Sequence, residues 1–397
     1  MSRTTALEDA APPADRASAS SDAARALANL DDARGGTLAL VADLCDADLE
    51  RVHSPIMSPL VWDLGHIAAY EDLWLGQRHA GLQLLRPDLA ELYDAFETPR
   101  AVRGEIEALG PEAAREYLAA VRARTAAALA REGLGDGTIC EMVLRHELQH
   151  SETMRQTMAI AGLLPAGDLA KRDRPLPAPA DGERGGDVSG EWIAIPAGPF
   201  AIGADGEGFA YDNERPRHTV ELRAFQIARL PVSNASWMRF SEGGGYERRE
   251  WWSDEGWAWK LQYDITHHPQ IAAGHAEAPA CHVSWFEADA FARAHDARLP
   301  TEAEWERAAT SEQEQETPAA IGQVWEWTTG TFHGYPGFRA HPYREYSEVF
   351  FGEDYRVLRG SSWATHPRVA GARFRNWDLP IRRQIFAGVR LARDNSA

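Results

Sequence analysis

The chain of 397 residues is 44% hydrophobic and 25% charged, which is typical of globular proteins and excludes the fibrous and wholly disordered classes. Its formal net charge of −19 disfavours nucleic acid and anionic membrane surfaces as partners. The length exceeds what one ordinary core accommodates and predicts two domains. Three widely spaced cysteines offer neither a disulfide framework nor a cysteine-based zinc site.

The N-terminal region lacks the apolar core of a signal peptide. Residues 1–22 are rich in Ala, Ser, Asp and Pro and are predicted to form a disordered tail. No apolar run along the chain approaches the ~20 residues of a membrane-spanning helix. We therefore expect a cytoplasmic protein with no membrane partner.

Residues 23–164 have the periodicity of a helical domain. Ser58 is a good N-cap and Pro59 suits a first helical position, so a helix is predicted to begin there. The predicted helices cover about 22–45, the segment from Ser58, about 111–132, and the segment from Thr138. Four helices that share an apolar seam predict a bundle.

A change of composition marks a second domain. Residues 165–190 end in the string PLPAPADGERGGDVSG, whose prolines and glycines predict a linker. Residues 191–394 are rich in Gly, Trp and short apolar runs and lack long helical periodicity. We expect Trp285, Trp305 and Trp325 to pack in the core of this domain.

Two histidines lie on the apolar face of the fourth predicted helix. His146 and His150 continue the row formed by Ile139, Val143 and Met154, at helical spacing. On the second predicted helix, His66 borders the apolar stripe, which consists of Leu60, Leu64, Ile67 and Tyr70. A bundle can bring the three imidazoles together, although hydrogen-bonded core histidines are the simpler alternative. Burying imidazoles without partners is costly, and a shared metal removes that cost.

His146, Glu147 and His150 also spell H-E-x-x-H, the signature of zinc peptidases. The further H-x-x-G-x-x-H extension is absent, and no third peptidase ligand is evident downstream. Three imidazoles suit Fe(II) as well as zinc, fill one face of an octahedron and leave three positions for other ligands. Such a site favours oxidative chemistry between a thiolate and dioxygen, so an iron enzyme and a zinc enzyme both remain open.

Several strings of the second domain resemble formylglycine-generating enzymes (sulfatase-modifying factors), whose fold is related to C-type lectins. They are WIAIPAGPFAIG (192–203), HVSWFEADAFARAHDARLPTEAEWERAA (282–309), GQVWEWTTG (322–330), YRVLRGSSW (355–363) and FAGVRLAR (386–393). The copper-binding cysteine pair of that activity is absent, because this domain has only Cys281. The resemblance therefore implies the fold but not formylglycine formation.

A DinB-like bundle with these histidines, fused to such a domain, resembles the hercynine-dependent sulfoxide synthases of ergothioneine biosynthesis. The likeness is carried by SPLVWDLGHIAAYEDLWL, ELYDAFETPR, HELQHSETM and FRNWDLPIRRQIFAGVRLA. It implies an α+β protein: a DinB-like four-helix bundle, then a C-type-lectin-like domain of the formylglycine-generating-enzyme type. The family includes the selenoneine synthases, a branch that joins a selenosugar to hercynine.

The resemblance implies an activity and a metal. The family uses Fe(II), hercynine and O2, and joins a cysteine-type sulfur to C2 of the hercynine imidazole as a sulfoxide. Its iron ligands fall on His66, His146 and His150. The resemblance makes Tyr343 the candidate catalytic tyrosine, with Tyr346 beside it, because a phenol can donate a proton.

The resemblance also implies substrate-binding residues. Trp377, Asn376 and Gln149 are the candidates for holding hercynine, whose trimethylammonium group suits an aromatic face. The candidates for holding the carboxylates and amine of γ-glutamylcysteine or cysteine are Arg100, Arg103, Asp378 and Arg382.

Departures near the donor region keep alternatives open. Leu379 lies inside NWDLPIR, the segment GEIEALGPE after Arg103 has no tyrosine, and RGSSW replaces the commoner RGGSW. A selenosugar donor is therefore an alternative to a thiol. The more distant alternatives are a zinc-dependent hydrolase or thiol transferase, and a non-catalytic ligand-binding module.

Overall fold

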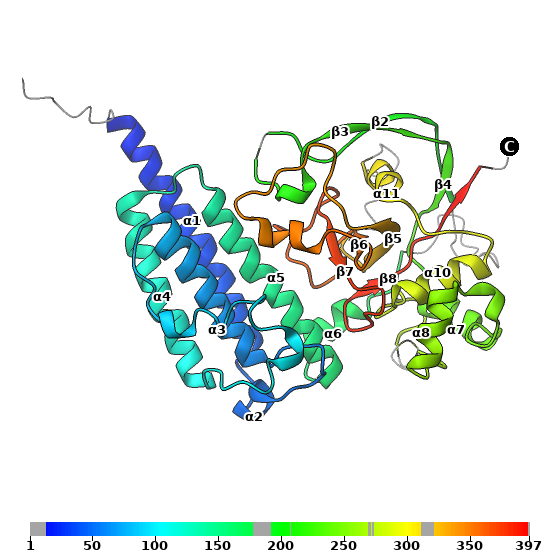
Figure 1. Cartoon of the computed structure of the whole chain (residues 1–397), viewed down its shortest axis with the longest axis horizontal. Helices are drawn as coiled ribbons and strands as arrows, with labels where there is room; N and C mark the ends of the chain where they lie inside the picture. Colours follow the sequence, from blue (N-terminus) through cyan, green and yellow to red (C-terminus); the bar gives the residue numbers. More distant parts are fainter. Residues whose placement is uncertain are drawn as a thin grey trace, which may run out of the picture. The chain divides into compact units, whose positions relative to one another are not determined.

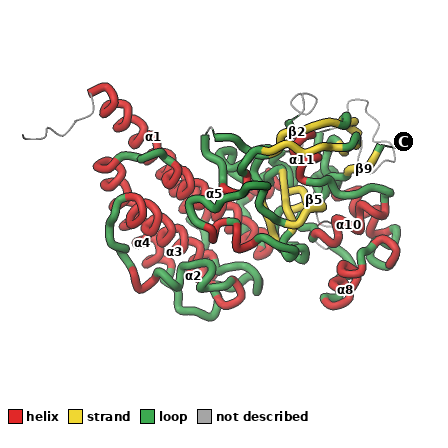
Figure 2. The backbone as a smooth tube through the Cα atoms, turned by 45° about the horizontal axis from the view of Figure 1, so that its top comes forward, coloured by secondary structure: helices red, strands yellow, loops and turns green. Residues whose placement is uncertain are grey.

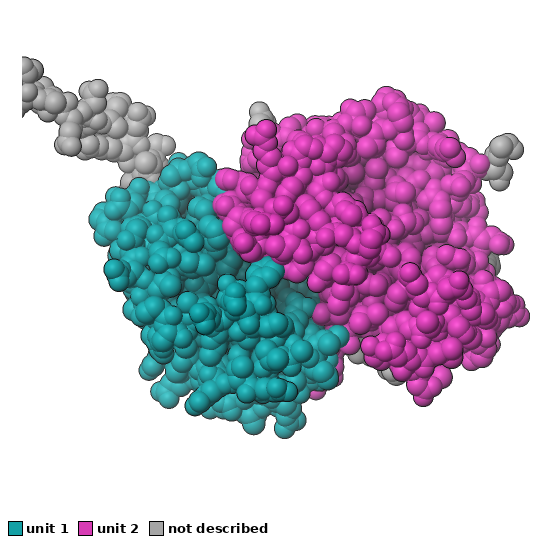
Figure 3. Space-filling model, in the orientation of Figure 1, with its two compact units in different colours: residues 1–157 teal, residues 158–397 magenta. Residues whose placement is uncertain are grey.

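The computed structural model describes residues 13–177, 192–206, 208–268, 271, 274–310 and 321–395. It divides into two compact units, residues 1–157 and 158–397, which Figure 3 shows in teal and magenta. The strands of the described residues belong to the second unit, as the yellow segments of Figure 2 show. The predicted α+β class is confirmed.

The first unit is a bundle of helices (Figure 1). Its elements are α1 (Pro13–Leu40), α2 (Asp46–Glu50), α3 (Leu60–Glu71), the π-helix η1 (Asp72–His79), the short turns η2 (Pro87–Leu89) and η3 (Arg100–Val102), α4 (Pro111–Glu132) and α5 (Thr138–Ala161). The predicted helix 111–132 and the predicted start at Thr138 are confirmed. The expected tail boundary at residue 22 falls inside α1, and residues 1–12 lie outside the described part of the chain.

Helix α3 is the central helix of this unit, because its residues from Leu60 to Ala68 are all buried. The predicted N-cap was wrong by one residue: Pro59 occupies the N-cap position and makes no side-chain capping bond. The reason is that Ser58 is buried and its hydroxyl oxygen accepts a hydrogen bond from Arg103, at 2.9 Å. The serine therefore fixes a later segment of the chain instead of capping the helix.

A buried network of charges links the helices of the first unit. Arg34 on α1 donates to Glu147 on α5 at 2.8 Å and to Glu71 on α3 at 2.8 Å. Arg122 on α4 donates to both carboxylate oxygens of Glu71, at 2.8 and 3.0 Å. Hydrogen bonds and opposite charges around Glu71 lower its pKa against the opposing effect of burial. Removing one partner would leave a buried charge uncompensated, so the network ties four helices together.

The second unit contains nine strands and several short helices among its described residues. Its strands form the sheets β1 (Trp192–Ile195), β4 (Phe225–Ala228) and β9 (Ala392–Asp394); β2 (Gly198–Ile202) and β3 (His218–Leu222); and β7 (Asn376–Asp378), β6 (Arg356–Arg359), β5 (Trp325–Thr331) and β8 (Ala387–Gly388). Its helices are α6 (Ala166–Arg172), α7 (Asn234–Glu242), α8 (Asp254–Gln262), α10 (Trp285–Ala294) and α11 (Glu302–Ala309). Helix α6 lies inside the predicted linker, whose residues 178–190 fall outside the described ranges.

Local sequence signals explain where two helices of this unit begin. Helix α10 begins with a capping box in which Ser284 and Glu287 bond each other's backbone, and α11 begins likewise with Thr301 and Glu304. Trp305 on α11 is fully buried, as is Trp325 on β5, so both belong to the predicted core. Trp285 is half-buried beneath the guanidinium of Arg356.

Among the described residues, no helix combines the length and apolar character that crossing a bilayer requires.

His282 is a buried histidine of the second unit that holds a left-handed backbone conformation, with φ of 68°. Its carbonyl oxygen accepts a hydrogen bond from the ring of His268, at 2.7 Å. Burial, aided by the neighbouring His268 and Arg172, lowers the pKa of His282 to about 3. The folded unit therefore holds this imidazole neutral through most of the acidic range.

The substitution His282→Asn should reduce the loss of stability in acid, and asparagine tolerates the left-handed conformation. An unfolded histidine titrates near pH ~6.5, so the unfolded wild type binds one more proton between about pH 6.5 and 3. The wild-type free energy of unfolding therefore falls as pH drops through this window, by up to ~1.4 kcal/mol per pH unit from this group. Chemical denaturation of both proteins across the window measures the difference, and equal slopes would contradict it.

Candidate active site

Three histidines of the first unit converge on one point. His66 comes from α3, while His146 and His150 come from successive turns of α5, and one nitrogen from each lies within 4.8 Å of the others. The Nε2 atoms of His66 and His146 are 3.1 Å apart. Two imidazole nitrogens bound side by side to one metal at ~2.0–2.1 Å would lie ~3 Å apart, so the spacing fits a shared ion. The structure brings together the three residues that the sequence predicts as metal ligands.

Hydrogen bonds at the other ring nitrogen orient two of these imidazoles. Nδ1 of His66 lies 2.6 Å from the carbonyl oxygen of Tyr93, which can only accept, so Nδ1 carries the proton and Nε2 is left with its lone pair. Nδ1 of His150 lies 3.0 Å from a carboxylate oxygen of Asp63, which is buried. Carbonyl and carboxylate partners of this kind set the tautomer and ring direction of metal-binding histidines.

The surroundings keep the histidines in the form that binds metal. Burial, followed by the neighbouring His150, lowers the pKa of His66 and of His146 well below its usual value. Metal binding needs a neutral imidazole, so this shift removes competition from protons at neutral pH. The second oxygen of Asp63 is buried and has no hydrogen-bond partner among the described residues. This oxygen places a carboxylate beside the three imidazoles, which fits a bound cation.

Aromatic rings wall the same cluster. Tyr70 stacks flat on His146, with ring centroids 3.6 Å apart, and Trp62 stacks on His66 at 4.8 Å. Both aromatic residues lie on α3, where Tyr70 belongs to the predicted stripe and Trp62 lies outside it. These contacts fix the ring planes and keep the imidazoles in a largely apolar setting.

Glu147 takes no part in this cluster. It is buried and receives hydrogen bonds from Arg34 at 2.8 and 3.2 Å, with Arg122 3.6 Å away. The zinc peptidases need the glutamate of H-E-x-x-H as a general base for the metal-bound water. Here two arginines hold that carboxylate as a structural anion, so the motif does not supply the base.

The predicted substrate residues of the first unit differ in their surroundings. Arg103 is buried, donates to Thr98, Ser58 and Ala95, and lies 3.7 Å over the ring of Trp62. Burial, followed by the charge of Arg100, lowers the pKa of Arg103 to about 10. Arg100 begins η3 and is exposed, while Gln149 is half-buried on α5 between the two histidine ligands.

The predicted site residues of the second unit also gather. Tyr343 directly precedes the short turn η6 (Arg344–Tyr346), and Tyr346 is its last residue. The centroids of the two rings are 6.2 Å apart. The ring of Tyr346 meets the ring of Trp377 edge-on at 5.9 Å. Trp377 stacks on Phe332 at 4.2 Å, which anchors it to the unit.

Strand β7, at the edge of the four-stranded sheet, carries Asn376 and Asp378, and Arg382 follows it in the chain. Its register places Trp377 opposite Val357 of β6. The side-chain oxygen of Asn376 accepts a hydrogen bond from the Trp377 amide at 2.9 Å. Arg382 is buried, and its Nε lies 3.7 Å from a carboxylate oxygen of Asp378. The predicted residues thus form two groups, one in each unit.

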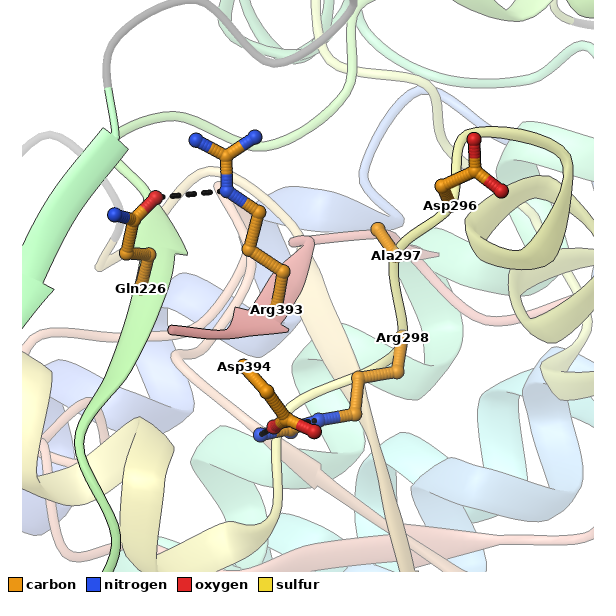
Figure 4. Close-up of a pocket in the computed structure, with 6 residues that line it drawn as sticks. All are labelled: Gln226, Asp296, Ala297, Arg298, Arg393 and Asp394. Carbon is orange, nitrogen blue, oxygen red and sulfur yellow. Dashed lines mark hydrogen bonds and ion pairs between the residues drawn. The ribbon is translucent and has the colours of Figure 1, made fainter. Parts of the chain in front are cut away.

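A surface hollow of about 620 Å³ in the second unit is not a candidate site. It is lined by Gln226, Asp296, Ala297, Arg298, Arg393 and Asp394, none of which is a predicted site residue (Figure 4). Arg298 is held by Glu304 and Asp394, and Arg393 donates to Gln226 at 2.7 Å. Three of the charged side chains that line the hollow, Arg298, Arg393 and Asp394, therefore already bind other groups of the protein.

Comparisons with known proteins agree with this architecture. A model of the DinB superfamily matches residues 29–154. A model of the sulfatase-modifying factor enzyme 1-like domain matches residues 182–320 and 319–395. Each predicted fold resemblance is confirmed.

Full-length relatives decide the family. The hercynine oxygenase of Mycolicibacterium thermoresistibile is 41% identical to this chain, over 91% of this chain and 93% of its own. This chain belongs to the hercynine oxygenase family. The Mycobacterium tuberculosis member is also 41% identical, over 91% of this chain and 97% of its own. In contrast, the formylglycine-generating enzyme of Streptomyces coelicolor is 36% identical over 30% of this chain. Membership of the family makes this chain an oxygenase, with hercynine oxygenases as its full-length relatives.

The residues that orient the histidines were not predicted from the sequence. Asp63 gives a usable signal, since it is the one charged residue in the apolar string SPLVWDLGHIAA and lies one turn before His66. The Tyr93 carbonyl gives no such signal, because every residue type has the same backbone acceptor. The partners of Glu147 depend on which helices meet, which the single sequence does not state.

The substitution Glu147→Gln should lower stability without removing the metal site. Loss of one partner from a buried ion pair costs roughly 3 kcal/mol or more, because Arg34 keeps its charge. We expect this fall in the free energy of unfolding of the helical unit, with metal content per folded protein unchanged.

The matched control on the same helix is Glu141→Gln, which breaks an i,i+4 pair with Arg145 that is only partly buried and should cost ~0.5 kcal/mol or less. Denaturation followed by circular dichroism and metal analysis together measure both variants. Unchanged stability with loss of activity would instead make Glu147 a catalytic base.

Proposed function

We propose that this protein is a non-haem Fe(II) oxygenase that uses O2 to join a donor sulfur to C2 of the hercynine imidazole, as in ergothioneine biosynthesis. The observation that carries the proposal is the three-imidazole centre, whose rings are already held by Tyr93 and Asp63. The names of the full-length relatives support hercynine as one substrate.

The three histidines would hold the metal as neutral ligands on one face. Imidazole nitrogens suit Fe(II), and three of them leave positions for a substrate imidazole, a thiolate and O2. When bound, the iron supplies activation of O2 and holds both substrates beside each other. Neutral imidazole ligands do not balance the positive charge of the metal. The nearby carboxylate of Asp63 would balance part of that charge, and an anionic donor would balance most of the rest.

Arg100 in η3 and Arg103 directly after it favour a donor that carries carboxylates. Arg103 and Arg100 both act to lower the pKa of His66, after burial and His150, so their positive potential reaches the histidine cluster. The guanidinium of Arg103 already donates to three protein oxygens, so its role is to supply charge and to hold Trp62 against His66. Arg100 is exposed and is the residue of this pair available for a two-pronged contact with a carboxylate.

The residues of the second unit have roles that their chemistry supports. The Trp377 ring, with the amide of Asn376, would hold the trimethylammonium group of hercynine. Gln149 of the first unit remains the candidate for the polar groups of hercynine. Asp378 and Arg382 would bind the amine and a carboxylate of the donor. Tyr343, with Tyr346 beside it, would donate a proton as oxygen is reduced, since its phenol hydroxyl can act as an acid.

A donor panel tests the proposal. The protein is loaded with Fe(II) without oxygen, then given hercynine, O2 and either cysteine, γ-glutamylcysteine or a selenosugar, with products identified by mass spectrometry. We expect a sulfoxide adduct, most rapidly from γ-glutamylcysteine, because it offers a carboxylate to the exposed guanidinium of Arg100.

The other outcomes of the panel discriminate between the alternatives. A selenium adduct with poor use of thiols would assign the chain to selenoneine formation. No adduct from any donor, despite bound iron, would overturn the oxygenase proposal and return the zinc hydrolase and thiol transferase to consideration.

Tyr343→Phe should remove the proton donor while keeping the ring. Loss of a general acid lowers rate by ~100-fold or more, so we expect kcat for the adduct to fall by that factor with iron content unchanged. Tyr346→Phe is the matched comparison and should lose less, because its ring contacts with Trp377 and Tyr211 survive the change. Equal losses in the two variants would contradict the assignment of Tyr343 as the donor.

A further inference from the structure

The loop 341–350 contains Tyr343 and Tyr346, and it is hydrogen-bonded to the carboxylate of Asp212, which lies far away in the sequence. Asp212, in the short turn η4 (Asp212–Glu214), accepts a hydrogen bond from the backbone amide of His341, at 3.3 Å. Its other oxygen accepts from the hydroxyl of Ser347. One side chain therefore holds the two ends of the segment between which Tyr343 and Tyr346 lie.

The residues on either side of Asp212 add to this support. The Asn213 side-chain amide donates to the same Ser347 hydroxyl, at 3.0 Å. The Tyr211 ring stacks on Tyr346, with centroids 4.5 Å apart and planes 7° from parallel. Asp212 and Ser347 are both buried, which shields these bonds from competition with water.

The same segment also contacts the string FRNWDLPIRRQIFAGVRLA, which contains Trp377. The carbonyl oxygen of Asn213 accepts a hydrogen bond from Arg375 at 2.7 Å. Arg375 is itself fixed by two bonds to Glu302, at 2.7 and 2.9 Å, and directly precedes Asn376 in the chain. Residues 211–213 thus contact both the tyrosine loop and the start of β7.

The loop has little regular structure of its own. It contains two single turns, η6 (Arg344–Tyr346) and η7 (Glu348–Phe350), and such isolated turns are weak without outside support. Burial raises the pKa of Asp212 above its usual value, while the bonds from Ser347 and His341 act to lower it. Those two bonds, together with one from the Asn213 backbone amide, stabilise the charged carboxylate in its buried position.

We infer that Asp212 is a positioning residue that fixes the loop 341–350 and thereby aims the phenol of Tyr343. The inference rests on the proposed function, in which Tyr343 donates a proton. Asp212 reaches the loop through the His341 amide and the Ser347 hydroxyl, so it acts on the reaction by holding the loop.

The test uses two variants of the contact and one control in the full-length, iron-loaded protein. Asp212→Asn keeps the size of the side chain but replaces one acceptor oxygen by a donor amide, so one of the two loop bonds is lost. Ser347→Ala removes the hydroxyl and leaves the carboxylate in place. Asp205→Asn is the control, since Asp205 is exposed in the same stretch and pairs with Arg217 at the surface, at 3.0 Å.

The first readout is amide hydrogen exchange, which does not depend on activity. We expect Asp212→Asn and Ser347→Ala each to raise exchange in peptides covering 338–352 and to leave peptides of α3 and α5 unchanged. Asp205→Asn should match the wild type. Unchanged exchange of the loop in both contact variants would overturn the inference whatever the activity assay shows.

The second readout is a kinetic cycle with Tyr343→Phe. A misplaced proton donor should lower kcat about 10-fold or more while KM for hercynine changes by about 2-fold or less. Adding Asp212→Asn to Tyr343→Phe should then cost nothing further, because both changes remove the same event. If Asp212 only stabilised the fold, the kcat losses of the two single variants would multiply in the double variant.

The outcomes separate the two claims. If the wild type makes the adduct but the kcat losses of Asp212→Asn and Tyr343→Phe multiply in the double variant, the positioning role is overturned and the proposed function stays intact. Absence of adduct from the wild type would overturn the proposed function, and the catalytic part of this inference with it. Loosening of the loop together with a non-additive cycle is the result that supports the inference.

Discussion

The hydrogen bond between His150 and Asp63 is the contact on which the candidate metal centre depends. Asp63 and His66 lie one turn apart on α3, so this helix supplies both a ligand and the group that orients a ligand of α5. A shift of either helix would break that bond and separate the Nε2 atoms that now lie 3.1 Å apart. The centre therefore exists only while α3 and α5 keep one relative position.

The buried charge network maintains that position from the other side of the helices. Glu147 follows His146 directly, yet it joins Arg34 instead of the metal centre, while Glu71 near the end of α3 joins Arg34 and Arg122. One turn of α5 therefore presents ligands on one face and a structural anion on another. This division of roles explains how an H-E-x-x-H string can belong to an oxygenase family without serving as a peptidase site.

The sequence predicted the parts of this arrangement that depend on local periodicity. Helical spacing placed His146 and His150 on one face and His66 beside the stripe of α3, and the structure brings them together. Resemblance placed Tyr346 and Trp377 in one site, and their rings meet. The sequence did not predict the Tyr93 carbonyl, the Ser58 bond to Arg103 or the Asp212 support of the tyrosine loop. Each of these joins segments far apart in the chain through backbone groups or single polar atoms, for which residue type carries almost no signal.

X-ray absorption at the iron edge of the Fe(II)-loaded protein tests the central claim most directly, because it reads the atoms bound to the metal. The account predicts three imidazole nitrogens from the protein in the first shell, and two when His146 is replaced by alanine. Binding through a carboxylate of the protein, or an unchanged shell in His146→Ala, would contradict a three-histidine centre in which Glu147 is a structural anion.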